Sequence, residues 1–249
     1  MRSAIRKIKP SKGVSHGVYI VLNVLLPVLL YVFVRADLAT IAIALLLISK
    51  WRMFAVRPRF WWPNVRTNAV DIIVGLAAIA AMNAGRFGYI GLAVVVVWAG
   101  WLLYIKPRSS VFWVSAQAFV GMVTGLLTVF AVASGGALWL LVAAVAAVCF
   151  FTAHHFLYAF EEQYLRLLAY TWAYFSAALM WILGHWLIFY GPIAQPALIL
   201  VTLGFGIGTL YYLDHFERLS ALVRRQIIFI MAATIICILV FSDWGDKVV

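Results

Sequence analysis

Nine long apolar runs, separated by short polar segments, limit what this chain can fold into more than any other feature. An α-helix of about 20 residues crosses the roughly 30 Å hydrocarbon core of a bilayer. Each run must be helical, because an open strand would leave backbone groups unpaired in lipid and no run alternates like a barrel strand. The sequence therefore predicts an all-α, polytopic membrane helical bundle with about nine transmembrane helices, at residues 15–34, 37–54, 68–84, 87–105, 111–133, 137–160, 165–190, 194–213 and 226–243.

The composition leaves no room for a water-soluble domain. Apolar residues make up 66% of the chain, charged residues make up 11%, and the mean hydropathy is +1.04. No polar stretch exceeds about twenty residues, so we expect a single transmembrane domain over residues 1–249. A basic tail, residues 1–14, precedes the first run. We interpret that run as an uncleaved span, because it is long and no small-residue cleavage site follows it.

Basic residues are distributed unevenly between the two sides that these helices would define. A cytoplasmic amino terminus places sixteen inside and three outside: inside are Arg2, Arg6, Lys7, Lys9, Lys12, Lys50, Arg52, Arg57, Arg59, Arg66, Lys106, Arg108, Arg166, Arg218, Arg224 and Arg225, and outside are Arg35, Arg86 and Lys247. The positive-inside rule then predicts a multi-pass protein of a cell inner membrane, with its amino terminus in the cytoplasm and its carboxyl terminus outside. The net charge of +11 lies between apolar runs, so we expect anionic lipids as partners and no nucleic acid.

The second run, residues 37–54, is the shortest. It offers about a dozen uninterrupted apolar residues before Lys50 and Arg52. As a full crossing, it requires these two side chains to extend toward the cytoplasmic headgroups. The alternative is a re-entrant hairpin, which would invert every later loop and spoil the charge asymmetry. We therefore expect a crossing.

The segment FFTAHHFLYAFEEQYLR, residues 150–166, concentrates ionisable side chains at the predicted cytoplasmic end of the sixth helix. Helical spacing places His154, Tyr158 and Glu161 on one stripe, and His155 and Glu162 on the next. Such groups at membrane depth suit a proton relay, a polar headgroup, or a divalent metal held by His154 and Glu161. The structural alternative is that the glutamates end a solvated helix and that neighbouring helices satisfy the histidines.

Asp71 lies about one turn into the third run, on the same predicted side. It is either a partner of the histidines or an acid favoured by a helix amino terminus and by Arg66. The loop YYLDHFERLSALVRR adds further charges at that side. We therefore predict one cytoplasm-facing polar cavity or proton relay, formed by Asp71, His154, His155, Tyr158, Glu161 and Glu162.

The loop at residues 50–67 interleaves basic and aromatic side chains. Tryptophan anchors at the membrane interface, and each basic residue near an anionic leaflet contributes about 1 kcal/mol of attraction. The loop is thus either an interfacial anchor or a site for an anionic headgroup, whose candidate residues are Lys50, Arg52, Arg57, Arg59, Arg66, Trp61 and Trp62.

The pattern EExxxR, formed by Glu161, Glu162 and Arg166, resembles the first motif of the CAAX-processing and bacteriocin-processing family of intramembrane peptidases. Membership would imply a peptidase with two further motifs, FxxxH and HxxxN or HxxxD. In this chain Trp181 stands in place of the phenylalanine, and Leu219 in place of the asparagine or aspartate. The resemblance covers six residues, and we do not assign the chain to that family.

These patterns rank three classes of function. The first is a permease or lipid-handling protein with a cytoplasm-facing polar cavity. The second is an intramembrane enzyme in which histidines and glutamates act as acid and base, or hold a metal, on a lipid or peptide substrate. The third is a structural membrane subunit. The sequence requires no cofactor, is compatible with a divalent metal, and leaves an oligomer or partner subunit open.

Overall fold

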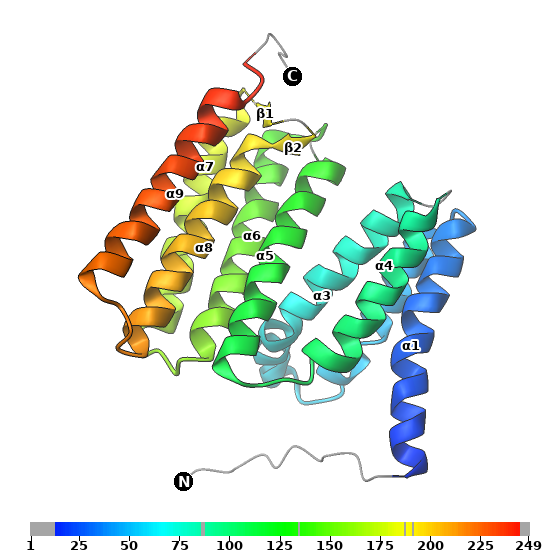
Figure 1. The fold of residues 1–249 in the computed structure, drawn as a ribbon. Coiled ribbons are helices and arrows are strands. Elements are labelled where there is room, and N and C mark those ends of the chain that lie inside the picture. The colour runs from blue at the N-terminus through cyan, green and yellow to red at the C-terminus, as the bar shows by residue number, and fades with distance from the viewer. Residues whose placement is uncertain (1–12, 86–87, 134, 187, 191, 245–249) are drawn as a thin grey trace.

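A computed structural model of the chain describes residues 13–85, 88–133, 135–186, 188–190 and 192–244. These residues form a helical membrane bundle, as the apolar runs predict (Figure 1). Seven helices are long and apolar enough to cross a membrane. They are α1 (Val14–Arg35), α3 (Trp61–Ala84), α5 (Val111–Ala133), α6 (Leu138–Tyr158), α7 (Leu165–Gly184), α8 (Gln195–His215) and α9 (Ala221–Phe241).

Two further apolar helices are shorter. Helix α4 (Tyr89–Gly100) continues as the π-helix η3 (Trp101–Ile105), and α2 (Ala39–Ile48) has only 10 residues. At 1.5 Å per residue, α2 is about 15 Å long, roughly half of the hydrocarbon core. The helix expected at residues 37–54 is thus shorter than predicted. Because α1 and α3 run in the same direction, the segment between them still leads from one end of the bundle to the other, and its crossing of the membrane stays a prediction. After α2 the chain continues through a turn and two short 3-10 helices, η1 (Trp51–Met53) and η2 (Pro58–Phe60).

The described residues form two large apolar cores and a smaller one, in which Phe150 and Leu157 of α6 pack against Ala169 and Ala173 of α7. One large core is built by α1 to α4 around Leu46, Met82 and Trp98, and the other by α5 to α8 around Leu126 and Met180. Helix α3 joins the two halves by packing against α5 and α6. Helix α9 packs against α8, and Ile238 is its one buried residue. Helix α3, which carries Asp71, thus lies where the two halves meet.

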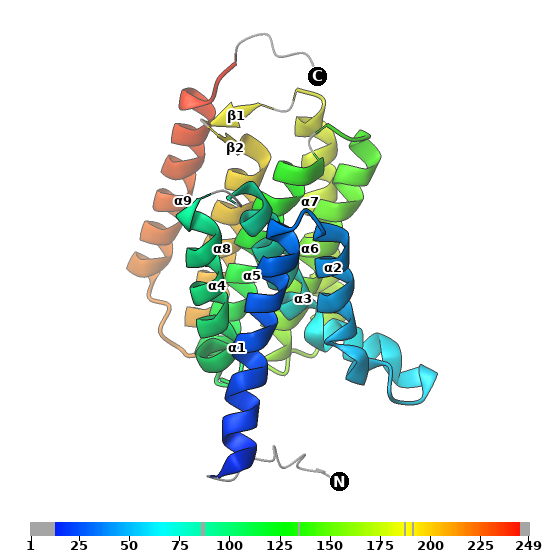
Figure 2. The ribbon, with the colours of Figure 1, turned by 90° about the vertical axis from the view of Figure 1, so that its right-hand side faces the viewer.

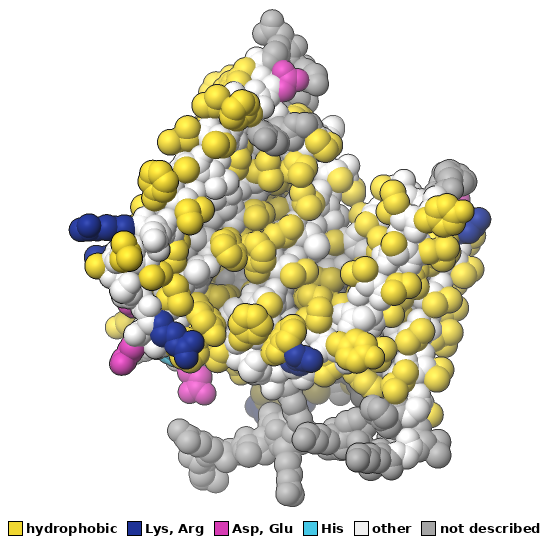
Figure 3. Space-filling view, viewed as in Figure 1, with side chains coloured by type: hydrophobic (Ala, Val, Ile, Leu, Met, Phe, Trp, Pro, Cys, Tyr) yellow, Lys and Arg dark blue, Asp and Glu magenta, His cyan; other side chains and the backbone are white. Residues whose placement is uncertain are grey.

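Successive long and short helices alternate in direction, so the loops gather at two ends of the bundle (Figures 1 and 2). Of the twelve described Lys and Arg residues, eleven fall at the end where α1, α3, α5, α7 and α9 begin, and Arg35 falls at the other. We call these the basic end and the far end. Figure 3 shows the broad apolar face between them, with dark-blue side chains at its margins. The cytoplasmic location of the basic end stays a prediction.

A short hairpin lies at the far end. Strand β1 (Phe189–Tyr190) pairs with β2 (Ile193–Ala194), and Phe189 also bridges to Asp243 after α9. The expectation that the seventh helix continues to residue 190 is wrong, because α7 ends at Gly184. Residues 189 and 190 pair instead with Ala194 and Ile193 across the hairpin.

Candidate functional site

Asp71 lies on the stripe of α3 that faces α2 and α4. Four residues further along this stripe, Gly75 lies close to Leu46 of α2 and Trp98 of α4. The neighbouring stripe faces the other half of the bundle, because Val70 contacts Gly121 of α5. The side chain of Asp71 therefore faces the carboxyl-terminal ends of α2 and of α4 with η3.

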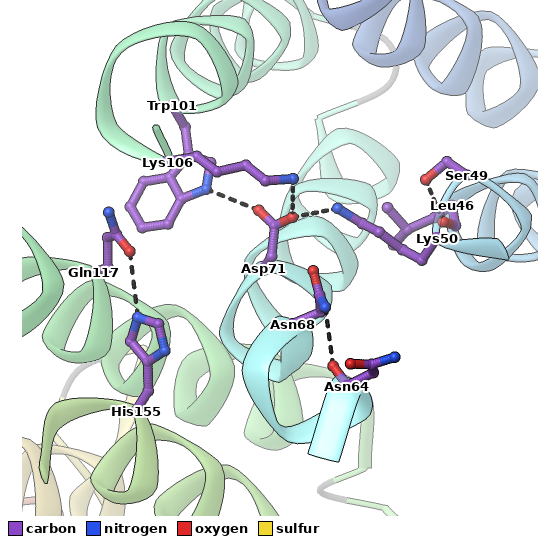
Figure 4. Close-up of polar contacts among 10 residues, drawn as sticks. All are labelled: Leu46, Ser49, Lys50, Asn64, Asn68, Asp71, Trp101, Lys106, Gln117 and His155. Carbon is purple, nitrogen blue, oxygen red and sulfur yellow. Dashed lines mark hydrogen bonds and ion pairs between the residues drawn. The ribbon is translucent and has the colours of Figure 1, made fainter. Parts of the chain in front are cut away.

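Two lysines bind the same carboxylate oxygen of Asp71. Lys50, just after α2, and Lys106, just after η3, each form an ion pair with Oδ2 (Figure 4). The indole Nε1 of Trp101 lies 3.4 Å from the other oxygen, Oδ1. The exposed fraction of the side chain is 10% for Lys50, 11% for Asp71 and 38% for Lys106. The expectation that Lys50 extends to the headgroups is wrong, because its charge is satisfied by Asp71 within the bundle.

The π-helix explains how Trp101 and Lys106 reach the same carboxylate. In an α-helix, residues five apart point about 140° away from each other. In η3 the backbone N–H of Lys106 donates to the carbonyl of Trp101, an i to i+5 bond of 2.9 Å. This wider turn brings the two residues toward one face, and such insertions are frequent at functional sites.

A buried glutamine extends these contacts to His155. The amide nitrogen of Gln117, on α5, donates to the carbonyls of Ile105 (2.8 Å) and Arg108 (3.1 Å), which flank Lys106. Its Oε1 lies 3.3 Å from Nε2 of His155, on α6. Because Oε1 is an acceptor, this ring nitrogen donates. We call the connected group the Asp71 network; its members are Lys50, Asp71, Trp101, Lys106, Gln117 and His155.

The predicted stripe from His154 through Tyr158 does not reach Glu161. Helix α6 ends at Tyr158, and Glu161 follows in the left-handed backbone region with φ 53°. Helical spacing therefore does not continue to Glu161, whose side chain is exposed. Tyr158 is 68% exposed, and its ring lies 6.5 Å from that of His154. The described residues contain no group of three His, Cys, Asp or Glu side chains that could hold a metal, so His154 and Glu161 gain no third ligand.

Glu162 belongs to a different cluster. It accepts a hydrogen bond from the hydroxyl of Tyr211, on α8, and one of 3.3 Å from the backbone N–H of Tyr164. The ring centre of Phe160 lies 5.1 Å from that of Tyr211 and 4.9 Å from that of His215. Asp71 and His155 do not touch each other but are linked through Gln117 and the backbone next to Lys106, whereas Glu162 has partners of its own. The single cavity that we expected stays a prediction.

The hydrogen bond from Tyr211 holds the pKa of Glu162 below its usual value, and the Tyr164 N–H acts in the same direction. A carboxylate with a lowered pKa stabilises the fold above its unfolded-state pKa, and this contribution disappears as the pH falls through the folded-state pKa. We therefore expect Tyr211→Phe to raise the pKa of Glu162 and to weaken the acid dependence of stability. Thermal unfolding in detergent between about pH 6 and about pH 3 measures this. An equal loss of stability on acidification in both proteins would contradict the assignment.

The basic aromatic loop is folded and projects sideways from the basic end, between α2 and α3 (Figure 2). The indole Nε1 of Trp61 donates to the carbonyls of Val56 (2.9 Å) and Phe54 (3.2 Å). The guanidinium of Arg59 lies 4.6 Å from the ring centre of Phe60. The large aromatic side chains of this loop remain exposed, as an interfacial anchor requires. The structure describes no side chain for Arg52, and the basic tail before residue 13 lies outside the described residues.

Sequence reasoning singled out Asp71, Lys50 and His155 but missed three members of the network. Lys106 was counted as a topology signal, and Trp101 and Gln117 were not considered. A signal was present, because Gln117 is an amide in an otherwise apolar helix, where a buried polar group needs partners. No protein family, curated protein or solved structure matches this chain.

Proposed function

We propose that this integral membrane protein is a lipid-handling permease that moves an anionic amphiphile, and that the Asp71 network receives its headgroup. The observation that carries the proposal is one carboxylate shared by two lysines inside the bundle. The three side chains have a net charge of +1, since two lysines contribute +2 and Asp71 contributes −1. A buried surplus charge is unfavourable unless a counter-charge offsets it.

The surrounding half of the bundle supplies no such counter-charge at the basic end, since its other acid, Asp37, lies at the far end between α1 and α2. Asp71 is the single acidic residue in the sequence from residue 38 to residue 160. Seven basic residues of this stretch lie at the basic end: Lys50, Arg52, Arg57, Arg59, Arg66, Lys106 and Arg108. A phosphate-bearing headgroup neutralises this excess of positive charge, whereas a neutral or cationic headgroup does not.

Lys106 gives a route by which a headgroup reaches the network. Its side chain is 38% exposed, whereas those of Lys50 and Asp71 are almost covered. An anion that pairs with Lys106 first would compete with Asp71 for both lysines. In the proposed cycle, the lysines exchange Asp71 for the headgroup, and Asp71 recovers them when the substrate leaves. The shared carboxylate therefore couples substrate binding to the contact between α3 and the two short helices.

Lipid translocation in liposomes tests the proposal. The purified chain is reconstituted with phosphatidylglycerol that carries a fluorescent label on an acyl chain, and dithionite reports the label that reaches the outer leaflet. We expect translocation of this lipid to exceed that of labelled phosphatidylcholine. We expect Asp71→Asn to slow translocation about tenfold, which corresponds to about 1.4 kcal/mol in the barrier.

Two controls separate the network from general effects. Asp214→Asn removes an acid at the same end of the bundle but outside the network, and we expect it to leave the rate unchanged. The triple variant Lys50→Met, Asp71→Leu and Lys106→Met removes the charges without leaving one unpaired, so it keeps the variant folded while abolishing headgroup selection. Equal rates in wild type, Asp71→Asn and the triple variant would overturn the proposal.

A further inference from the structure

A second basic cluster lies on the opposite stripe of α3. Arg66 sits one turn after Trp62, and its guanidinium lies 5.6 Å from the centre of that ring. Trp62 in turn contacts Phe151 of α6, with 6.1 Å between ring centres. On α6, the ring of His154 lies 5.9 Å from that of Phe150, and Phe150 in turn contacts Tyr170 of α7, one turn after Arg166. Side chains from α3, α6 and α7 therefore meet around one basic centre.

This cluster lacks an anionic partner. Within the described parts of the chain, neither Arg66 nor Arg166 forms an ion pair, and Nε of Arg66 is buried without a hydrogen-bond acceptor. A buried donor without a partner is unfavourable, and guanidinium groups bind phosphate oxygens in paired hydrogen bonds. The missing acceptor thus has the chemistry of a phosphate.

The aromatic side chains indicate that this phosphate belongs to a lipid. Phe150 contacts Tyr170 of α7, with 4.8 Å between ring centres. On both helices the polar group is nearer the basic end than the ring: His154 follows Phe150 on α6, and Arg166 precedes Tyr170 on α7. The basic groups thus lie at the level of lipid headgroups, and these two rings lie deeper, at the level of the acyl chains. This order matches the two ends of a lipid.

We propose that Arg66, His154 and Arg166 form a docking site for the phosphate of an anionic membrane lipid, with Trp62 and Tyr158 beside its headgroup and Tyr170 beside its acyl chains. These three aromatic side chains are 52%, 68% and 58% exposed, so they are open to a lipid. The site uses other residues than the Asp71 network. The role of this site as the first docking point of the transported lipid rests on the proposed function. Lipid binding at the site is tested independently of transport.

Native mass spectrometry of the full chain in a neutral detergent tests the site. The probes are dioctanoyl phosphatidylglycerol, dioctanoyl phosphatidylcholine and inorganic phosphate. We expect the wild type to bind the phosphatidylglycerol preferentially, and Arg66→Gln to weaken this binding about tenfold. We expect Arg166→Gln, which changes an exposed side chain, to weaken it in the same direction.

Arg108→Gln is the matched control. Arg108 also lies over a tryptophan, 4.0 Å from the ring centre of Trp113, but in the loop between η3 and α5. We expect this variant to bind like the wild type. Equal binding of phosphatidylcholine, competition by inorganic phosphate at equal concentration, or unchanged binding in both Arg66→Gln and Arg166→Gln would overturn the site. Binding that depends on Arg66 without any translocation would keep the site and refute the proposed function.

Discussion

Asp71→Leu is expected to lower the free energy of unfolding by about 3–5 kcal/mol, because it leaves lysine charges inside the bundle without a partner. Most of this loss comes from Lys50, whose side chain is 10% exposed. Lys106 contributes less, since its 38% exposed side chain can turn toward water. Unfolding by sodium dodecyl sulfate in mixed micelles, followed by circular dichroism, measures the change.

A compensated variant separates charge from packing. When Lys50→Met and Lys106→Met accompany Asp71→Leu, no charge remains unpaired, and apolar replacements of buried ion groups are often neutral or stabilising. We therefore expect the triple variant to recover most of the stability that Asp71→Leu loses. If the triple variant is as unstable as Asp71→Leu, the loss comes from shape and not from the unpaired lysines.

Gly125→Leu is the second change with a large expected effect. A Cβ at this position of α5 would lie 2.6 Å from Ile73 on α3 and 2.9 Å from Val148 on α6. Both neighbours belong to packed helices, so the helices must separate to admit the side chain. Overpacking of this kind costs about 1–3 kcal/mol, and we expect the upper part of that range.

The same unfolding titration measures this loss, with Gly100→Ala as the control. A Cβ at Gly100 would meet no atom within 4 Å, and alanine favours a helix over glycine by about 1 kcal/mol. We therefore expect Gly100→Ala to be neutral or stabilising. Wild-type stability in Gly125→Leu would mean that α3, α5 and α6 do not approach each other in this way.

Hydropathy located the helices wherever apolar residues end sharply. The fifth run, residues 111–133, matches α5 at both ends, since Ser109 and Ser110 precede it and glycines follow it. The third helix begins at Trp61 instead of residue 68. Its first turns contain polar residues that resemble a loop, but Thr67 and Asn68 satisfy their side chains by donating to carbonyls four residues earlier.

The candidate site was harder to predict, because its contacts join residues far apart in the sequence. Asp71 stood out as an acid within an apolar run, but nothing local indicated that its partners are 21 and 35 residues away, at Lys50 and Lys106. The π-helical turn that directs Lys106 toward Asp71 was not predicted from the sequence. Glu161 was misplaced for the opposite reason, since helical spacing was extended beyond the true end of α6.

The short α2 also affects the surrounding bilayer. Its apolar face, with Ile41, Ile48 and Leu47 exposed, is only about 15 Å tall. The basic aromatic loop begins directly after this helix. The apolar surface that faces lipid tails is therefore shorter beside α2 than beside α5 or α6. A bilayer relieves such mismatch by thinning locally, at a fraction of a kcal/mol per Å. We therefore expect the membrane to be thinnest beside α2, where a lipid would have the shortest distance to cross.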